Sequence, residues 1–396
     1  MSRTLFQSGP RNDGRPARPT EDSYAFLNRV DQPYWGRVRD QVEGLYARFP
    51  AEGREDLGRR FRSQLPGQHY AAWWELYLFG LFDALGFSVR VHPNVEGVRQ
   101  KPDFQLDGQG TRFNLEAVTT FVDVASPNPA LDAAIVDMIN TLPNRGFFLH
   151  VEFPQRGSEQ PRRSQVLRPI NEWLGGLDRE AVRATLDQTP WNPPRKAFEA
   201  AGWLIECVAF SGRRDPSEMQ SHRLVGIGPS IAGYVNDAGA VRNALKRKVG
   251  RYDRNEQLVL ALLVVGAGAD IESIEQALFG RVGFVHSVDE PGTPTPPREL
   301  DGLWLHAGRP QARRVSAVLT AMNLLPWSFT KDWPRLWPNP WAMRPLTVDL
   351  PFPTSAVGGH RKMGAGDLPP TPHAAFDLPA DWPGPEAPFV RQPGGT

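Results

Sequence analysis

The chain of 396 residues carries 45 Lys plus Arg against 44 Asp plus Glu, which gives a formal net charge of +1. This balance excludes binding of nucleic acid through the charge of the whole molecule and leaves only local basic patches for that role. The single cysteine, Cys207, excludes a disulfide framework and multi-cysteine metal sites, and no apolar run is long enough to span a membrane. We therefore expect a cytoplasmic protein without membrane contact.

Both ends of the chain have compositions typical of disorder. Residues 1–20 are polar and rich in Arg and Pro, whereas residues 351–396 are rich in Pro and Gly and lack apolar periodicity. Such segments bury too little apolar surface to offset their chain entropy. We predict a disordered arm at 1–20, a helical segment at 21–67 that opens the folded body, and a disordered tail at 351–396.

The folded body alternates helical and strand-like patterns. Apolar residues at helical spacing predict helices over 31–61 and 68–85. The expected elements that follow are strands at 87–92, 103–106 and 112–118, a helix at 129–141, a strand at 146–153, a helix at 169–188, a strand at 203–210, a basic helix at 238–252, a buried strand at 257–265, a helix at 270–279, and a last strand pair at 303–306 and 315–322. This alternation predicts an α/β protein.

Glu75 is an isolated charge in a helix that is otherwise apolar on nearly all sides. Burial of a lone carboxylate costs several kcal/mol unless the group is paired or binds a metal. Glu75 is therefore either a metal-binding carboxylate or the partner of an arginine at the edge of the helix.

Asp103 and Glu116 flank a predicted hairpin. With Gly108-Gln109 as its two-residue turn, Asp103 pairs with Asn114 and Glu116 is the diagonal neighbour on the same face. The two backbones are then roughly 7–8 Å apart. Carboxylates at this spacing can converge on one divalent cation.

A helical Glu, a Pro-Asp pair that opens a strand and a Glu on the next strand resemble the restriction-endonuclease-like superfamily, which is described by the motif PD-(D/E)XK. The resemblance covers residues 68–153, in the α-β-β-β-α-β order of that family's core, and leaves 154–350 as an α/β extension or subdomain. It implies that Asp103 and Glu116 hold Mg²⁺ or Mn²⁺, with Glu75 as a third carboxylate. The bound cation would activate a water for phosphodiester hydrolysis.

The chain departs from the family motif at the lysine that follows the strand Glu by two residues. That position is Val118. Either a lysine from another element replaces it or the protein is a catalytically inactive relative. The candidates for a displaced lysine are Lys248 and Lys246, both in the predicted basic helix; the alternative for them is a solvated basic face.

Two basic patches are candidates for contact with nucleic acid. Arg242, Arg247 and Arg251 lie in or next to the predicted basic helix, and Arg162 and Arg163 lie in a loop. We expect them to contact the phosphates of nucleic acid, DNA in the first place. The alternative is a solvated surface, since this chain uses Arg far more often than Lys.

The function that these patterns favour is metal-dependent hydrolysis of nucleic acid, in bacterial DNA defence or repair as the resemblance suggests. It requires that Glu75, Asp103 and Glu116 converge, with a lysine ammonium within about 5 Å of their centre. The alternative is a nuclease-fold protein that lost catalysis and serves as a binding or assembly module. A small-molecule enzyme built on the turn from Gly266 to Asp270 would instead show a pocket there and no carboxylate cluster. The sequence neither requires nor excludes a homo-oligomer.

Overall fold

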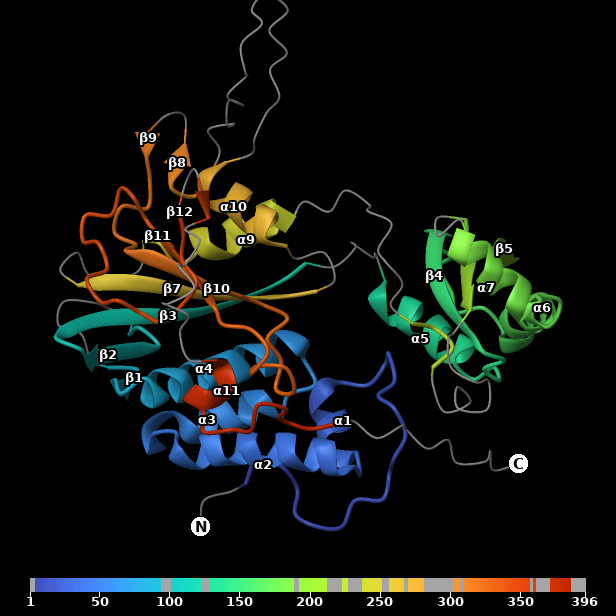
Figure 1. Ribbon diagram of the computed structural model, residues 1–396, viewed down its shortest axis with the longest axis horizontal. Helices are drawn as coiled ribbons and strands as arrows, with labels where there is room; N and C mark the ends of the chain where they lie inside the picture. Colours follow the sequence, from blue (N-terminus) through green and yellow to red (C-terminus); the bar gives the residue numbers. More distant parts are fainter. Residues whose placement is uncertain are drawn as a thin grey trace, which may run out of the picture. The chain divides into compact units, whose positions relative to one another are not determined.

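The structure is a computed structural model that describes residues 4–93, 101–122, 128–188, 192–211, 223–226, 237–250, 256–266, 270–280, 302–306, 309–356, 359–360 and 371–385. The chain divides into two compact units (Figure 1). Unit 1 comprises residues 1–8, 35–124 and 234–385, and unit 2 comprises residues 9–34, 125–233 and 386–396. Unit 2 therefore interrupts unit 1, and residues 68–153 do not form one contiguous core.

Unit 1 is built on a six-stranded mixed sheet with the order β1-β2-β3-β7-β10-β11. Strands β3, β7 and β10 are parallel to one another, and the outer strands are antiparallel to their neighbours. The strands are β1 (Ser88–Val91), β2 (Phe104–Gly108), β3 (Thr111–Phe121), β7 (Gln257–Val265), β10 (Ala317–Met322) and β11 (Arg335–Pro338). The continuous apolar run of β7 fits its place inside a sheet covered on both faces.

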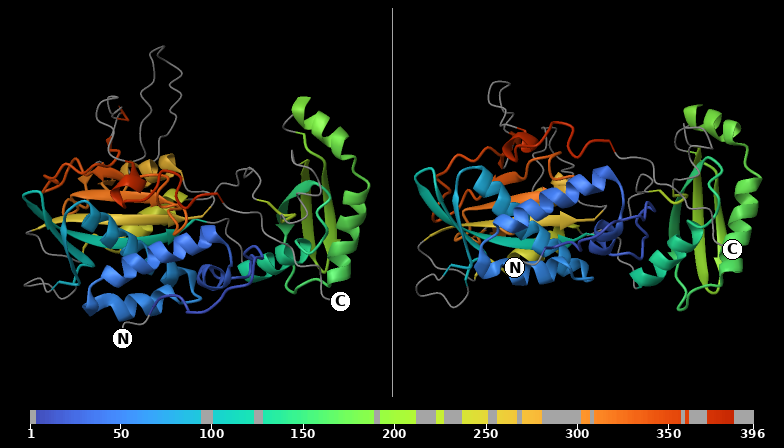
Figure 2. Two further views of the ribbon diagram at one scale, coloured as in Figure 1. Left: turned by 60° about the horizontal axis from the view of Figure 1, so that its bottom comes forward. Right: turned by 90° about the horizontal axis from the view of Figure 1, so that it is seen from below.

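Helices cover both faces of this sheet (Figures 1 and 2). Helices α2 (Pro33–Arg48), α3 (Ala51–Phe61) and α4 (Pro66–Ala84) lie on one side, and α9 (Asp237–Lys246) and α10 (Ile271–Phe279) lie on the other. The single helix expected over 31–61 is two helices, because Pro50 removes a backbone donor at the break. Helix α4 is apolar all round because it lies between the sheet and its neighbours, and Trp74 Nε1 donates to the Ala261 carbonyl at 2.8 Å.

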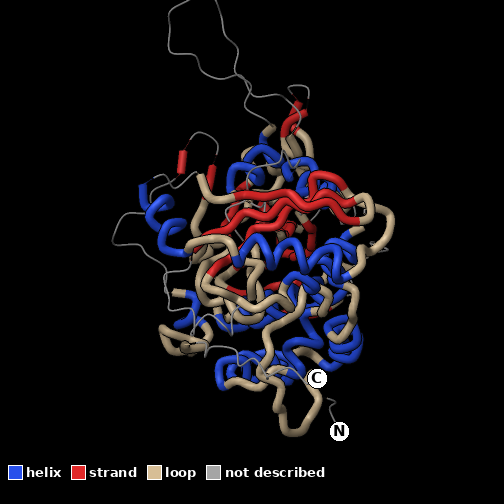
Figure 3. Tube along the Cα trace, turned by 90° about the vertical axis from the view of Figure 1, so that its right-hand side faces the viewer, coloured by secondary structure: helices blue, strands red, loops and turns tan. Residues whose placement is uncertain are grey.

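Unit 2 contains a three-stranded antiparallel sheet with the order β4-β6-β5. An apolar cluster that includes Ile135, Ile170 and Ile205 joins this sheet to helices on one face. Its elements are α1 (Ser23–Arg29), α5 (Pro129–Ile139), β4 (Phe147–Gln155), α6 (Arg163–Gly175), α7 (Arg179–Gln188), β5 (Arg195–Ala200) and β6 (Trp203–Ser211). The helix expected at 169–188 is thus two helices, and β5 is a strand that the sequence patterns did not predict. Figure 3 distinguishes helices from strands in both units.

The remaining described elements are short. They are β8 (Leu305–His306), β9 (Arg309–Pro310), β12 (Ser355–Ala356), β13 (Gly359–His360) and α11 (Pro372–Ala375). The predicted pairing of the strands near 303–306 and 315–322 is wrong: β8 pairs with β9, whereas β10 lies between β7 and β11. No helix in the described ranges combines the length and the apolarity needed to cross a membrane.

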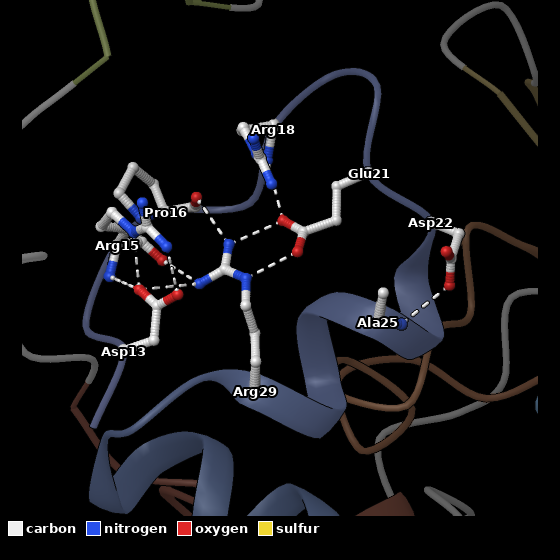
Figure 4. Close-up of polar contacts among 8 residues, drawn as sticks. All are labelled: Asp13, Arg15, Pro16, Arg18, Glu21, Asp22, Ala25 and Arg29. Carbon is white, nitrogen blue, oxygen red and sulfur yellow. Dashed lines mark hydrogen bonds and ion pairs between the residues drawn. The ribbon is translucent and has the colours of Figure 1, made fainter. Parts of the chain in front are cut away.

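The described parts of both chain ends are packed, which corrects the prediction of disorder for them. Phe6 is 4% exposed, and Trp382 packs against Phe329 with ring centroids 4.9 Å apart. In unit 2, Arg29 forms ion pairs with Glu21 at 2.6 Å and with Asp13 at 3.3 Å (Figure 4). A few large aromatic side chains and one shared arginine anchor segments whose average composition is typical of disorder.

Candidate functional site

The hairpin between β2 and β3 places two acidic residues directly opposite each other. Its turn is Gln109-Gly110, with φ values of 52° and 73°, which is the backbone of a type I′ turn. Phe104 therefore pairs with Leu115, and Asp103 lies directly across from Glu116. The expected turn at Gly108-Gln109 and the diagonal placement are wrong. Because the pairing shifts by two residues, both acids still lie on one face.

The two carboxylates are held at this position by the backbone of the hairpin. Asp103 Oδ2 accepts a hydrogen bond from the Ala117 N–H at 2.8 Å, and the Asp103 N–H donates to Glu116 Oε2 at 3.4 Å. Glu116 is 1% exposed, whereas Asp103 keeps a partly exposed edge. Of the two residues, Asp103 is therefore the more accessible to a ligand.

Lys248 supplies the cation that pairs with Glu116. Its Nζ donates to Glu116 Oε1, and its backbone N–H donates to the Leu245 carbonyl at 2.9 Å in the turn that follows α9. Val118, which stands where the family motif has lysine, is buried in the same apolar cluster as Leu245. The turn that follows α9, the helix packed with Val118, thus carries the lysine that reaches Glu116.

Burial and nearby negative charge raise the pKa of Asp103 well above its usual value. Burial of the carboxyl group is the largest cause, followed by the charges of Glu116 and Glu75. The Ala117 N–H and the Lys248 ammonium act in the opposite direction and offset the rise only in part. The carboxylates of β3 and α4 therefore share one electrostatic site with Asp103.

Glu75 comes from α4 and is fully engaged by an arginine. Arg60 of α3 donates from Nη1 to Glu75 Oε1 at 2.7 Å and from Nη2 to Glu75 Oε2 at 2.6 Å. The Nε of Arg60 donates to Asp56 at 2.8 Å, so the guanidinium is fixed on both sides. Of the two expectations for Glu75, the structure has the ion pair with arginine.

The other predicted residues lie on α9, directly after it, or in unit 2. Lys246 and Arg247 are exposed at the end of α9, Arg242 is partly buried on the same helix, and Arg251 lies outside the described residues. Arg162 and Arg163 belong to unit 2 and are exposed, and Arg163 donates to Thr141 Oγ1 at 2.9 Å. Of the candidate lysines, only Lys248 contacts a carboxylate within the described part of the chain.

Three polar residues beside the acids were not predicted. Asn114 Nδ2 donates to Glu256 Oε2 at 2.6 Å, and Gln105 Nε2 donates to the same oxygen at 3.3 Å. Gln105 and Asn114 are a cross-strand pair on the face of the hairpin that carries Asp103 and Glu116. Their alternation with the acids along β2 and β3 was the available signal, whereas Glu256, which precedes β7, carried none.

The donor set fits a hard divalent cation. Within the described residues, no three His, Cys, Asp or Glu side chains converge as a metal-binding group. Asp103 and Glu116 nevertheless provide two carboxylates side by side, and Mg²⁺ commonly uses one or two carboxylates and completes its shell with water and phosphate oxygens. These two residues would hold the cation.

Cys207, Asp270 and two of the tryptophans have structural roles. Cys207 is buried, and burial raises the pKa of its thiol to about 12, so it is not an activated nucleophile. Asp270 caps α10 by accepting from the Ser273 N–H at 2.6 Å, and residues 267–269 of the glycine turn lie outside the described residues. Residues 326–341 are rich in Trp and Pro; among them, Trp337 is buried in β11 and Trp327 packs on Trp35.

No family model, curated protein or solved structure matches this chain. The assignment of function therefore depends on the residues of the site alone.

Proposed function

We propose that unit 1 is a metal-dependent nuclease with a restriction-endonuclease-like core made of α4, β1, β2, β3, α9 and β7. In this proposal, unit 2 is an insertion between β3 and α9. The single observation that carries it is the contact of the Lys248 ammonium with Glu116, which itself lies across from Asp103. A hairpin and a turn 132 residues later in the chain thereby bring two carboxylates and a lysine together.

The chemistry follows from these side chains. Asp103 and Glu116 would hold Mg²⁺ or Mn²⁺, which supplies the charge that lowers the pKa of a bound water and neutralises the scissile phosphate. Lys248 orients Glu116 through its ion pair, and its partly exposed ammonium can contact the attacking water or a phosphate oxygen. The backbone N–H of Ala117 fixes one oxygen of Asp103, which leaves the other for the cation.

The end of α9 provides a route for the nucleic acid. Lys246 and Arg247 are exposed and lie within two residues of Lys248 in the chain, so they are the cations available to hold phosphates near this end of α9. Such contacts are independent of base sequence and position the backbone of the substrate. We therefore assign Lys246 and Arg247 to binding and Lys248 to catalysis.

The test is a cleavage assay on plasmid DNA, single-stranded DNA and RNA with Mg²⁺ or Mn²⁺. Glu116→Gln and Lys248→Met should each lower the cleavage rate by at least about a hundredfold, because each removes charge aimed at the reacting phosphate. Lys246→Met is the matched control, since it removes an exposed lysine two residues away and should mainly weaken binding.

Two outcomes would contradict the proposal. Cleavage that survives Glu116→Gln would place the activity elsewhere. A wild-type protein that binds the metal and DNA without cutting any of the three substrates would favour the alternative of an inactive nuclease fold that acts as a binding or assembly module.

A further inference from the structure

Unit 2 contains a cavity that the proposed function does not use. Its volume is about 600 Å³, which lies within the range of roughly 300–1,000 Å³ that small-molecule sites occupy. The cavity is found at the end of the sheet where the Ala201-Gly202 turn joins β5 to β6. Its lining includes Gln155 at the end of β4, Gln165 in the first turn of α6, Glu199 of β5 and Leu204 of β6.

Three of these side chains form one row across the sheet. Gln155 pairs with Leu204, and Leu204 pairs with Glu199 on its other side. Directly paired residues project from the same face of a sheet, and neighbouring strands are about 4.7–4.9 Å apart. This face is turned away from the apolar cluster of unit 2, because Ile205, the next residue of β6, belongs to that cluster. The partly exposed Leu204 thus lies between two polar side chains, which suits a flat ligand that contacts Leu204 with one face.

The two glutamines are each fixed at one end of the amide, which leaves the other end to a ligand. Gln155 Nε2 donates to the Gly202 carbonyl at 3.0 Å, so its Oε1 is an acceptor. Gln165 Oε1 accepts from the Arg162 N–H at 3.2 Å, so its Nε2 is a donor. The exposed Glu199 carboxylate has no hydrogen bond or ion pair with another residue of the described ranges. Among the described residues that line the cavity, Glu199 carries the only charge.

This set of groups selects the chemistry of the ligand. A carboxylate only accepts hydrogen bonds, so the part of the ligand that faces Glu199 must carry N–H or O–H donors. Guanine has two adjacent donors on its Watson–Crick edge, N1–H and the N2 amino group, and the acceptor O6 beside them. Both donors can bind one carboxylate while Gln165 Nε2 donates to O6. Adenine, cytosine and uracil lack two adjacent donors on that edge, so guanine is the base that matches Glu199 and an amide donor together.

A cation for the phosphate of a nucleotide lies beside this cavity. The backbone of Arg162 contacts Gln165, and the side chain of Arg162 is exposed. A guanidinium can bind two oxygens of a phosphate at once. A ligand with its base against Glu199 and its phosphate against Arg162 would use both groups.

We infer that this cavity of unit 2 is a binding site for a guanine nucleotide. Glu199 recognises N1–H and the N2 amino group, Gln165 recognises O6, and Arg162 binds the phosphate. The inference goes beyond the proposed function, since none of these residues belongs to the carboxylate site of unit 1 and no cleavage step is involved. The same chemistry is present in a free nucleotide and in a guanine of single-stranded nucleic acid, and the experiment distinguishes these two sources.

The first experiment is calorimetric titration of the full chain with GMP, IMP, AMP, CMP and UMP. GMP should bind with one equivalent and at least about tenfold more tightly than IMP, which lacks only the N2 amino group that donates to Glu199. The other three nucleotides should bind no more tightly than IMP. This comparison uses the wild type alone and does not depend on the folding of a variant.

The carboxylate is tested by Glu199→Gln, which removes its charge and one of its two acceptor oxygens. This variant should lower the affinity for GMP by at least about tenfold and remove the preference for GMP over IMP. Glu152→Gln is the matched control, because it makes the same change of charge in the same sheet at a residue outside the lining of the cavity. It should bind GMP within about twofold of the wild type.

The phosphate contact is tested by Arg162→Gln. This variant should lower the affinity for GMP by at least about threefold and leave the affinity for guanosine unchanged, because guanosine has no phosphate. Arg168→Gln is the matched control: Arg168 is exposed on the same helix, where it pairs with Glu172 at 2.8 Å, and its loss should change neither affinity.

A single-stranded pentanucleotide with one central guanine identifies the source of the ligand. If it binds at least as tightly as GMP, the cavity takes a guanine of a nucleic acid. If it does not bind although GMP does, the cavity takes the free nucleotide. Both results support recognition of guanine.

Four results would overturn the inference: no binding of GMP at millimolar concentration, equal affinities for GMP and IMP, GMP binding that survives Glu199→Gln, or tighter binding of Nα-acetylarginine amide than of GMP. The last result would assign the cavity to a basic side chain of a partner protein. Glu116→Gln should lose cleavage but bind GMP like the wild type, so the failure of the proposed function and the failure of this inference are distinguishable.

Discussion

Each unit of the molecule places two carboxylates directly opposite each other on antiparallel strands. In unit 1 they are Asp103 and Glu116, and in unit 2 they are Glu152 of β4 and Glu206 of β6. The difference lies in burial. The side chain of Glu116 is 2% exposed, whereas those of Glu152 and Glu206 are 37% and 27% exposed.

The partners of these acids differ in the same way. In unit 2, His150 contacts Glu152 at 2.9 Å and Arg195 contacts Glu206 at 3.5 Å, both from the strands of the same small sheet. In unit 1, the partner of Glu116 comes from the turn after α9, 132 residues later in the chain. Opposed acids at a surface need little compensation, but a buried pair costs free energy that a paired cation helps to offset. The comparison indicates that burial, and not the pairing of acids, distinguishes the candidate site from the acid pair of unit 2.

The largest difference between the two acid pairs should appear in catalysis. Asp103→Asn with Glu116→Gln should abolish Mn²⁺ binding and lower any cleavage rate by at least about a hundredfold, since both ligands are lost. The matched variant, Glu152→Gln with Glu206→Gln, should keep both properties within twofold of the wild type, which corresponds to ~0.4 kcal/mol. Equal losses in the two variants, measured by titration and by cleavage assay, would remove the distinction between the units.

Lys248 and Arg195, which pair with the acids of the two units, should differ in their contribution to the free energy of unfolding. Lys248→Met leaves the carboxylate of Glu116 buried without its partner and should lower the free energy of unfolding by about 3 kcal/mol. Arg195→Met removes the corresponding surface pair in unit 2 and should cost less than about 1 kcal/mol. Urea unfolding of both variants without metal gives the two values. A cost for Lys248→Met as small as that for Arg195→Met would mean that Glu116 is solvated.

The buried pair should also make stability depend on pH. The pKa of Asp103 is raised above its usual 3.8, so the folded protein binds this proton more tightly than the unfolded chain. The stability that comes from this group is complete below the unfolded pKa and is lost as the pH rises through the folded pKa. In EDTA, Asp103→Asn should therefore have a higher urea midpoint than the wild type at neutral pH, and the difference should shrink toward pH 3.8.

Glu152→Gln is the control for this pH effect, because its carboxylate lies at the surface of unit 2. Its urea midpoint should follow that of the wild type across the same pH range. If Asp103→Asn also follows the wild type, the Asp103 carboxyl group is solvated in the folded protein, and the contrast between the acid pairs disappears.

Local patterns in the sequence predicted many elements, because each reflects residues that are neighbours in the chain. The apolar run of β7 was predicted with the bounds that the structure has, 257–265. The hairpin of β2 and β3 was predicted too, although its turn was misplaced by one residue. The Gln-Gly pair at 109–110 has the glycine at the second central position, and this is the signal that gives the correct turn.

Contacts between residues that are far apart in the chain could not be predicted from such local patterns. Strand β4 follows β3 in the chain and was assigned to the same core by the order α-β-β-β-α-β; it pairs instead with β6 in unit 2. Nothing in its residues specifies which sheet it joins, and the place beside β3 is taken by β7. Likewise, Lys246 and Lys248 are equivalent by composition, and only the turn after α9 directs Lys248 to Glu116.

The smallest predicted effects concern the two hairpin turns, in which the units are alike. Gln109-Gly110 in unit 1 and Ala201-Gly202 in unit 2 both have positive φ at both positions. Since asparagine tolerates this backbone better than other non-glycine residues, Gln109→Asn and Ala201→Asn should each stabilise the protein, on the order of 0.5 kcal/mol. Urea unfolding measures both gains in stability, and titration with Mn²⁺ measures metal binding at Asp103 and Glu116.

Similar gains with unchanged Mn²⁺ binding would show that the turns are equivalent and that burial of the acids alone distinguishes the two sheets. Loss of Mn²⁺ binding in Gln109→Asn would instead show that this turn residue sets the register that brings Asp103 opposite Glu116.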